Sequence, residues 1–147
     1  MHKPIDPFYI AYRGAFTSLL KWSDLNAFWL VLSSQADRGW YIYTTAEPAP
    51  GQAASPDELR DFIRKIDRHL HTAHDEDYCG IVYTDSKIEP TYIKIYDPKN
   101  LGVVCGIGRE PIFPGWIISQ LPPQALDGLP ALADETKPWW RKFLPGG

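Results

Sequence analysis

The segment SPDELRDFIRKIDRHLHTAH at residues 55–74 constrains the fold more than any other part of the chain. Ser55 can cap a helix, Pro56 suits its first position, and Glu58 completes the spacing of a capping box. Apolar residues then recur every three or four positions: Leu59, Phe62, Ile63, Ile66, Leu70 and Ala73. The sequence therefore predicts an amphipathic helix here, whose apolar side must be covered by other segments.

Short segments rich in aromatic and β-branched residues predict the strands that this helix would cover. They are WYIYTT at 40–45, CGIVYTD at 79–85, TYIKIYD at 91–97 and LGVVCG at 101–106. The last three would form an up-and-down meander, with DPKN at 97–100 as the second turn. GWIIS at 115–119 predicts one more strand, and the prolines around it favour a place at the sheet edge.

The first forty residues are less clearly patterned. Asp6 and Pro7 suit a helix start, and the apolar spacing after them predicts a helix over residues 7–20. Residues 24–36 are open to two interpretations, because their apolar run FWLVL fits either a second helix or a buried strand. We favour a strand that forms a hairpin with WYIYTT through the loop QADRG.

Together these segments predict an α+β fold with a single antiparallel β-sheet of about five to six strands, packed by one or two amphipathic helices. A length of 147 residues favours one domain. We expect this α+β domain to span residues 1–123, and residues 124–147 to form a C-terminal extension with a basic aromatic segment.

Charge and hydropathy bear on partners and location. The net charge of -3 lacks the basic footprint of a nucleic-acid-binding protein, so no nucleic-acid partner is expected. No apolar run approaches the roughly 20 residues of a transmembrane helix. The first residues lack the features of a signal peptide, and two cysteines are few for a secreted chain, so a cytoplasmic location is expected.

Cys79 and Cys105 are the two cysteines of the chain. In the predicted meander they lie at opposite ends of the sheet, about two strand spacings or roughly 10 Å apart across it. Because a disulfide requires Cα atoms within about 7 Å, we expect two independent thiols that share neither a bridge nor a metal. The acidic residues before Cys79 would raise its pKa, which leaves Cys105 as the better candidate for reactivity.

The predicted turn at 97–100 places Tyr92 opposite Cys105, with Lys94 on the same face and Arg109 nearby. Basic groups lower the pKa of a neighbouring thiol and attract anions. Tyr92, Lys94, Cys105 and Arg109 are therefore the candidate ligand-binding residues of a small-anion or thiol site. The simpler interpretation, which we favour, is that Cys105 is a small buried residue.

Three histidines, His69, His71 and His74, lie close together near the end of the predicted helix. Helix geometry points His69 away from the other two, and the spacing departs from the H-E-x-x-H pattern of zinc helices. Histidines at a helix C-terminus also interact favourably with the helix dipole. Neither a metal site nor another cofactor is expected, and metal binding through His71 and His74 is the weaker alternative.

The segment KPWWRKF at 137–143 concentrates aromatic and basic side chains. Trp139, Trp140, Arg141 and Phe143 are candidate partner-binding residues, because Trp and Arg are frequent among interface hot spots. The alternative is that the two tryptophans cover the open end of the protein's own sheet. The sequence does not decide between these two interpretations.

The sequence contains no nucleophile elbow, no phosphate loop and no dinucleotide fingerprint, so an enzymatic activity is unsupported. Our leading hypothesis is a small soluble accessory or protein-interaction domain with a possible protein partner and no catalysis. The alternative is a small-molecule (anion) binding or thiol-chemistry protein with its site around Cys105.

Overall fold

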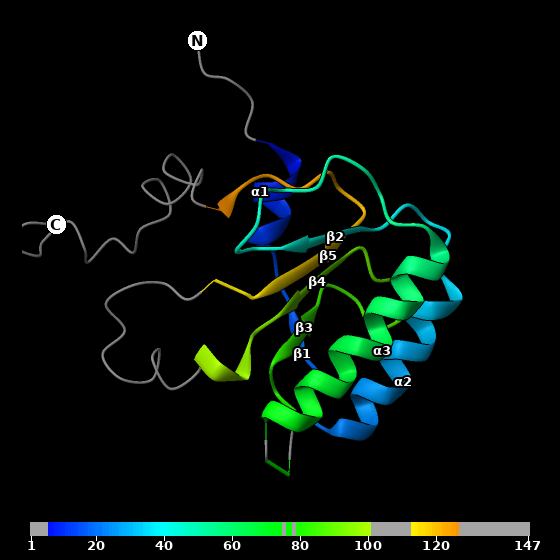
Figure 1. Ribbon diagram of the computed structural model, residues 1–147, viewed down its shortest axis with the longest axis vertical. Helices are drawn as coiled ribbons and strands as arrows, with labels where there is room; N and C mark the ends of the chain where they lie inside the picture. The colour runs from blue at the N-terminus through cyan, green and yellow to red at the C-terminus, as the bar shows by residue number, and fades with distance from the viewer. Residues whose placement is uncertain (1–5, 75, 78, 101–112, 127–147) are drawn as a thin grey trace, which may run out of the picture.

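The computed structural model describes residues 6–74, 76–77, 79–100 and 113–126, and Figure 1 shows their arrangement. The elements in chain order are α1 (Pro7–Tyr12), β1 (Thr17–Ser18), α2 (Trp22–Ser34), β2 (Tyr41–Thr44), α3 (Pro56–Ala73), β3 (Val82–Thr84), β4 (Tyr92–Ile95), the 3-10 helix η1 (Pro98–Asn100) and β5 (Trp116–Ser119). The five strands form one antiparallel sheet with two main helices against it, which confirms the predicted α+β fold class.

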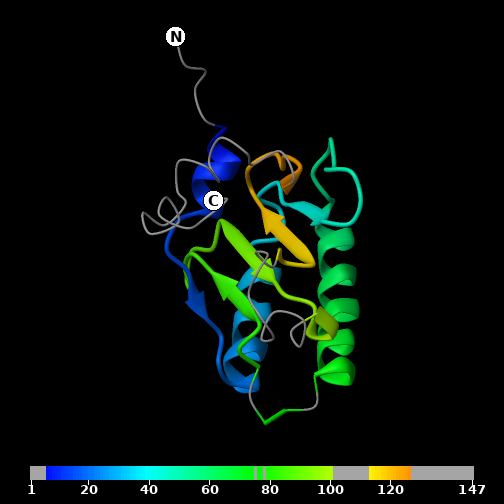
Figure 2. The ribbon, with the colours of Figure 1, turned by 90° about the vertical axis from the view of Figure 1, so that its left-hand side faces the viewer.

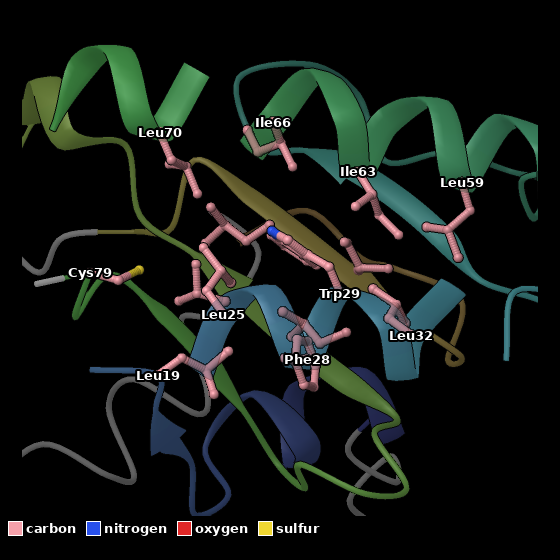
Figure 3. Close-up of a cluster of buried hydrophobic side chains, with 14 of the residues drawn as sticks. Leu19, Leu25, Phe28, Trp29, Leu32, Leu59, Ile63, Ile66, Leu70 and Cys79 are labelled. Carbon is pink, nitrogen blue, oxygen red and sulfur yellow. The ribbon is translucent and has the colours of Figure 1, made fainter. Parts of the chain in front are cut away.

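Helix α3 has the predicted start and the predicted buried side. The Ser55 side-chain oxygen accepts a hydrogen bond from the Glu58 amide at 3.1 Å, and Glu58 Oε1 accepts one from the Ser55 amide at 2.8 Å. Figure 3 shows the apolar side chains of α3 directed toward α2 and the sheet; the buried ones are Leu59, Ile63, Ile66 and Leu70. The local capping signals therefore predicted this helix correctly.

The prediction of a hairpin strand within residues 24–36 is wrong, because these residues belong to α2. The buried side chains of α2 follow helical spacing: Leu25, Phe28, Trp29 and Leu32. Trp29 also donates from Nε1 to Asp67 Oδ1 of α3 at 3.0 Å, a bond that ties the two helices together. The run FWLVL is apolar on every side because it contains exposed Leu30 and half-buried Val31 beside the buried Phe28, Trp29 and Leu32.

The helix predicted over residues 7–20 is shorter than expected. It ends at Tyr12, where Gly14 closes the last turn with a hydrogen bond from its amide to the Ala11 carbonyl at 2.9 Å. Residues further on form β1, which pairs with β3. Strand pairing at the sheet edge therefore outweighs the helical spacing of the apolar residues in this segment.

The strand order in the sheet is β1-β3-β4-β5-β2, with every neighbouring pair antiparallel. The predicted pairing of the segments at 79–85 and 91–97 is present as β3 and β4. The edge position predicted for the GWIIS segment is wrong, because β5 lies between β4 and β2. Its prolines flank the strand without interrupting the ladder, and Ile117 and Ile118 are fully buried, one on each face.

Strand β4 has β3 on one side and β5 on the other, so β5 holds the position that the meander assigned to residues 101–106. Those residues lie outside the described part of the chain. The predicted turn at 97–100 contains η1, whose Lys99 amide donates to Asp97 Oδ1 at 3.1 Å.

The sheet separates two apolar clusters. Helices α2 and α3 run side by side along one face, while α1 lies toward the other (Figures 1 and 2). The cluster beneath α1 contains Phe8, Tyr43, Tyr92, Ile117 and Leu126. Leu126 falls within the predicted C-terminal extension, so the first residues of that extension pack on the domain; residues 127–147 lie outside the described residues. Within the described ranges, no helix is both long and apolar enough to cross a bilayer.

Candidate functional site

The structure describes two of the four residues of the predicted ligand site. Tyr92 and Lys94 lie on β4 and share the face of the sheet that α1 covers, as the alternation of the strand predicts. In the register, Tyr92 pairs with Ser119 of β5, the position that the sequence interpretation gave to Cys105. Cys105 and Arg109 lie outside the described residues, as do Trp139, Trp140, Arg141 and Phe143.

The amino group of Lys94 is enclosed by the segment that joins α1 to β1. Lys94 Nζ donates a hydrogen bond to the Tyr12 carbonyl oxygen at 2.5 Å. It also lies 4.1 Å from the centre of the Tyr12 ring and 4.0 Å from the centre of the Phe16 ring. Both ring faces carry partial negative charge, so this arrangement stabilises a cation and disfavours an anion beside it.

Burial lowers the pKa of Lys94 to about 8, and the nearby charge of Arg13 acts in the same direction. The Tyr92 hydroxyl is buried without a hydrogen-bond partner in the described structure, and burial raises its pKa. Neither side chain therefore presents a free donor to solvent. The described half of the predicted site positions the N-terminal segment on the sheet and gives no support to anion binding.

The lowered pKa of Lys94 makes stability depend on pH in a predictable direction. Between about pH 8 and the ordinary value of 10.5, the unfolded chain binds more protons at this residue than the folded chain. The free energy of unfolding should therefore rise with pH across this window. Urea titrations at about pH 7 and about pH 9.5 measure this change. Between these two pH values, the free energy of unfolding of the wild type should rise by about 1–2 kcal/mol more than that of Lys94→Met. Parallel pH dependence in the two proteins would contradict the assignment.

Cys79 is fully buried at the end of the cluster beneath α2 and α3 (Figure 3). Burial is the main cause that raises the pKa of its thiol, and the charge of Asp67 adds to it. The sequence predicted the direction of this pKa shift correctly but attributed it to the acidic residues directly before Cys79, whereas burial is the main cause. A buried thiol of raised pKa is unreactive toward alkylating agents.

The three histidines near the end of α3 each contact a different group. His69 Nε2 lies 3.4 Å from Asp97 Oδ1, His71 Nε2 lies 3.4 Å from Asp67 Oδ1, and His74 Nε2 lies 3.0 Å from the Cys79 carbonyl oxygen. No group of three or more side chains that could together ligate a metal ion occurs in the described ranges.

A surface that the sequence interpretation missed lies on the outer side of α2. Its apolar members, which we call the α2 patch, are Ala27, Leu30 and Val31. Leu30 is 74% exposed and Ile88 is 76% exposed, which makes them the two most exposed large apolar side chains of the described residues. Ala27, Leu30 and Val31 occupy adjoining turns of one helix side.

Ile88 lies in the loop between β3 and β4, and this loop is held beside the end of α2 by several hydrogen bonds. Ser86 Oγ accepts from the amides of Ile88 at 3.2 Å and Glu89 at 3.0 Å. Gln35, at the end of α2, donates from Nε2 to the Ile88 carbonyl at 3.0 Å, and Arg38 pairs with Glu89 at 2.7 Å. The exposed isoleucine therefore projects from a fixed backbone beside α2.

A pocket opens next to the α2 patch, with a volume of about 140 Å³. It is lined by Leu19, Asp24, Ala27, Phe28, Val31 and Lys87. Its lining is mainly apolar and includes one acidic and one basic residue. For comparison, a dry protein cavity of about 150 Å³ is large enough to bind benzene. The pocket can thus accept one branched aliphatic side chain.

One signal in the sequence would have located this surface. A helix that is apolar on every side, in a domain with one sheet, cannot bury all of its sides, so part of the FWLVL run must face outward. Comparison of the chain with protein-family models, curated proteins and solved structures finds no match.

Proposed function

We propose that this protein is a non-catalytic protein-interaction domain whose docking surface is the α2 patch with its adjoining pocket. The observation that carries the proposal is the exposure of Leu30 on α2 together with an open apolar pocket that Ala27 and Val31 of the same helix line. Single exposed apolar residues are ordinary on protein surfaces. Several that adjoin one another and a pocket indicate an interaction site.

The energetics support the same conclusion. Burying one leucine or isoleucine side chain contributes about 1.5–3 kcal/mol, and in the described residues neither Leu30 nor Ile88 obtains this within its own chain. The hydrogen bonds around Ile88 reduce the conformational entropy that docking would cost. A partner that covers both side chains would gain this stabilisation with little rearrangement.

The partner should offer an aliphatic side chain for the pocket, a base opposite Asp24 and an acid opposite Lys87, because these two residues line it. The outer side of α3 is a poorer docking surface for such a partner, because its charged side chains form ion pairs with one another. Asp61 lies 3.2 Å from Arg64 and 2.8 Å from Lys65. Exposed ion pairs of this kind give little binding energy.

The remaining sequence predictions are part of the proposal in weaker form. The KPWWRKF segment would be a second docking element, and the cytoplasm would be the place of action. The alternative function, anion binding or thiol chemistry around Cys105, has less support because Lys94 is already enclosed by Tyr12 and Phe16.

The proposal is tested by placing a photo-cross-linking residue at Ala27 on the α2 patch and, as a matched control, at Lys65 on the outer side of α3. We expect one discrete protein adduct from position 27 and none from position 65. Leu30→Glu should reduce that adduct at least about tenfold, because a carboxylate would be desolvated in the contact. The identified protein should also bind the purified wild type in calorimetry at least about tenfold more tightly than it binds Leu30→Glu.

Identical adduct patterns at the two positions would overturn the proposal. So would an adduct at position 27 whose yield and whose binding in calorimetry are unchanged by Leu30→Glu. In that case the apolar side of α2 would be an exposed surface without a docking role.

A further inference from the structure

We infer that Lys94 is a covalent site for small aldehydes, which its amino group captures as an iminium ion between the Tyr12 and Phe16 rings. This inference goes beyond the docking function and is independent of the α2 patch. It rests on three features around the amino group: the lack of a carboxylate partner, a neighbouring cation, and the two ring faces. The first two activate the amine, and the third stabilises its product.

Lys94 is a half-buried lysine without an acidic partner. Its amino group contacts the Tyr12 carbonyl oxygen and the rings of Tyr12 and Phe16, and no carboxylate within the described ranges pairs with it. The charge that acts on it is that of Arg13, the exposed residue directly after α1. Lysines that react as nucleophiles are activated in these two ways, by removal from water and by a nearby cation.

The neutral amine is the form that attacks a carbonyl carbon, because its lone pair makes the new bond. With a pKa of about 8 in place of 10.5, about one-tenth of Lys94 is neutral at pH 7, roughly 300-fold more than for an ordinary lysine. Tyr12 beside the amine and Tyr83 opposite it on β3 are its titratable neighbours besides Arg13. Burial raises the pKa of Tyr12, which therefore supplies no negative charge.

The reaction converts one cation into another and needs no oxidant or reductant. The lone pair of the amine forms a bond to the aldehyde carbon, and a proton moves from nitrogen to oxygen to give a carbinolamine. The carbinolamine takes up one proton and loses its hydroxyl group as water, which leaves a C=N bond. The sum is protonated Lys94 plus aldehyde giving iminium plus water, so charge and atoms balance.

The surroundings of the amino group fit the iminium as well as the ammonium. The ring centres of Tyr12 and Phe16, at 4.1 and 4.0 Å from Nζ, offer their faces to either cation. An iminium keeps one N–H, which is enough for the hydrogen bond to the Tyr12 carbonyl oxygen. Because the rings and this carbonyl occupy much of the space around a half-buried nitrogen, the aldehyde should be small.

The test treats the full chain with acetaldehyde and cyanoborohydride at about pH 7, which reduces each iminium to a stable ethyl-lysine that peptide mass spectrometry assigns. Lys65 and Lys87 are controls within the same molecule, because both are exposed. We expect Lys94 to be alkylated at least about tenfold faster than either, since its larger neutral fraction outweighs the weaker nucleophilicity of a less basic amine. Accessibility alone predicts the opposite order.

Two further measurements test the cause of this advantage. Arg13→Glu replaces the nearby cation by an anion, so it should raise the pKa of Lys94 and slow its alkylation at least about threefold. Arg64→Glu makes the same charge change on the outer side of α3 and should leave the rate unchanged. In concentrated urea, the advantage of Lys94 over Lys65 and Lys87 should disappear. Thermal unfolding shows that both variants retain the fold.

Alkylation of Lys94 no faster than that of Lys65 and Lys87 in the folded chain would overturn the inference. So would an advantage that persists in urea, where the rings no longer surround the amine, or one that Arg13→Glu leaves unchanged. None of these results bears on the docking function, because its test depends on Leu30 and the opposite side of the sheet.

Discussion

Leu32→Ala should lower the free energy of unfolding by about 3 kcal/mol, whereas Leu30→Ala should change it by less than about 0.5 kcal/mol. Both residues lie in α2, two positions apart. Leu32 is fully buried in the cluster between the helices and the sheet, and its truncation leaves a cavity there (Figure 3). Leu30 is 74% exposed and loses no packing when truncated.

This pair of variants also tests whether residues 24–36 form the helix α2 or the strand that the sequence had suggested. In a strand, residues two positions apart share one face, so the two truncations would have similar costs. In a helix they differ by about 200° around the axis, so the costs differ strongly. Urea unfolding measures both values. Equal losses for Leu30→Ala and Leu32→Ala would contradict the orientation of α2.

Phe8→Ala should lower the free energy of unfolding by about 3 kcal/mol through loss of the cluster beneath α1. The Phe8 ring is fully buried and lies 5.2 Å from the Tyr92 ring and 6.3 Å from the Tyr43 ring, centre to centre. Its removal leaves a cavity between α1 and the sheet and frees the segment that encloses Lys94. Ile10→Ala, on the exposed side of the same short helix, is the control and should change stability by less than about 0.5 kcal/mol.

Denaturant unfolding of the two variants, followed by tyrosine and tryptophan fluorescence, gives the comparison. The pKa of Lys94 offers a second reading, since loss of the covering segment should let water reach the amino group and return its pKa toward 10.5. A cost for Phe8→Ala no greater than that for Ile10→Ala would show that α1 does not pack on the sheet in solution.

The sequence was most informative where the deciding interactions are local. In α3, the capping bonds join residues three apart, and the buried stripe repeats along one continuous segment. The strands at 40–45, 79–85 and 91–97 were similarly predictable, because β-branched and aromatic residues favour a pleated surface. The fold class followed from these elements.

Residues that bear on function were harder to place, because their surroundings come from distant parts of the chain. The neighbours of Lys94 are Tyr12 and Phe16, about eighty positions earlier, and no rule of spacing brings them together. Ile88 lies beside the end of α2 only because its carbonyl oxygen accepts a hydrogen bond from Gln35. The predicted site around Cys105 relied instead on a register between consecutive strands, and Ser119 holds that position beside Tyr92.

The amino-acid sequence by itself determined the elements whose stability comes from neighbours within a few residues: the capped helix α3, the strands that pair as β3 and β4, and the α+β class. Tertiary structure alone decided that FWLVL is helical, that β5 is an inner strand and that one side of α2 is exposed. The physical reason is that burial is a property of the assembled layers. An apolar segment takes the local conformation that buries most of its surface against the rest of the core. That core exists only once distant strands have paired.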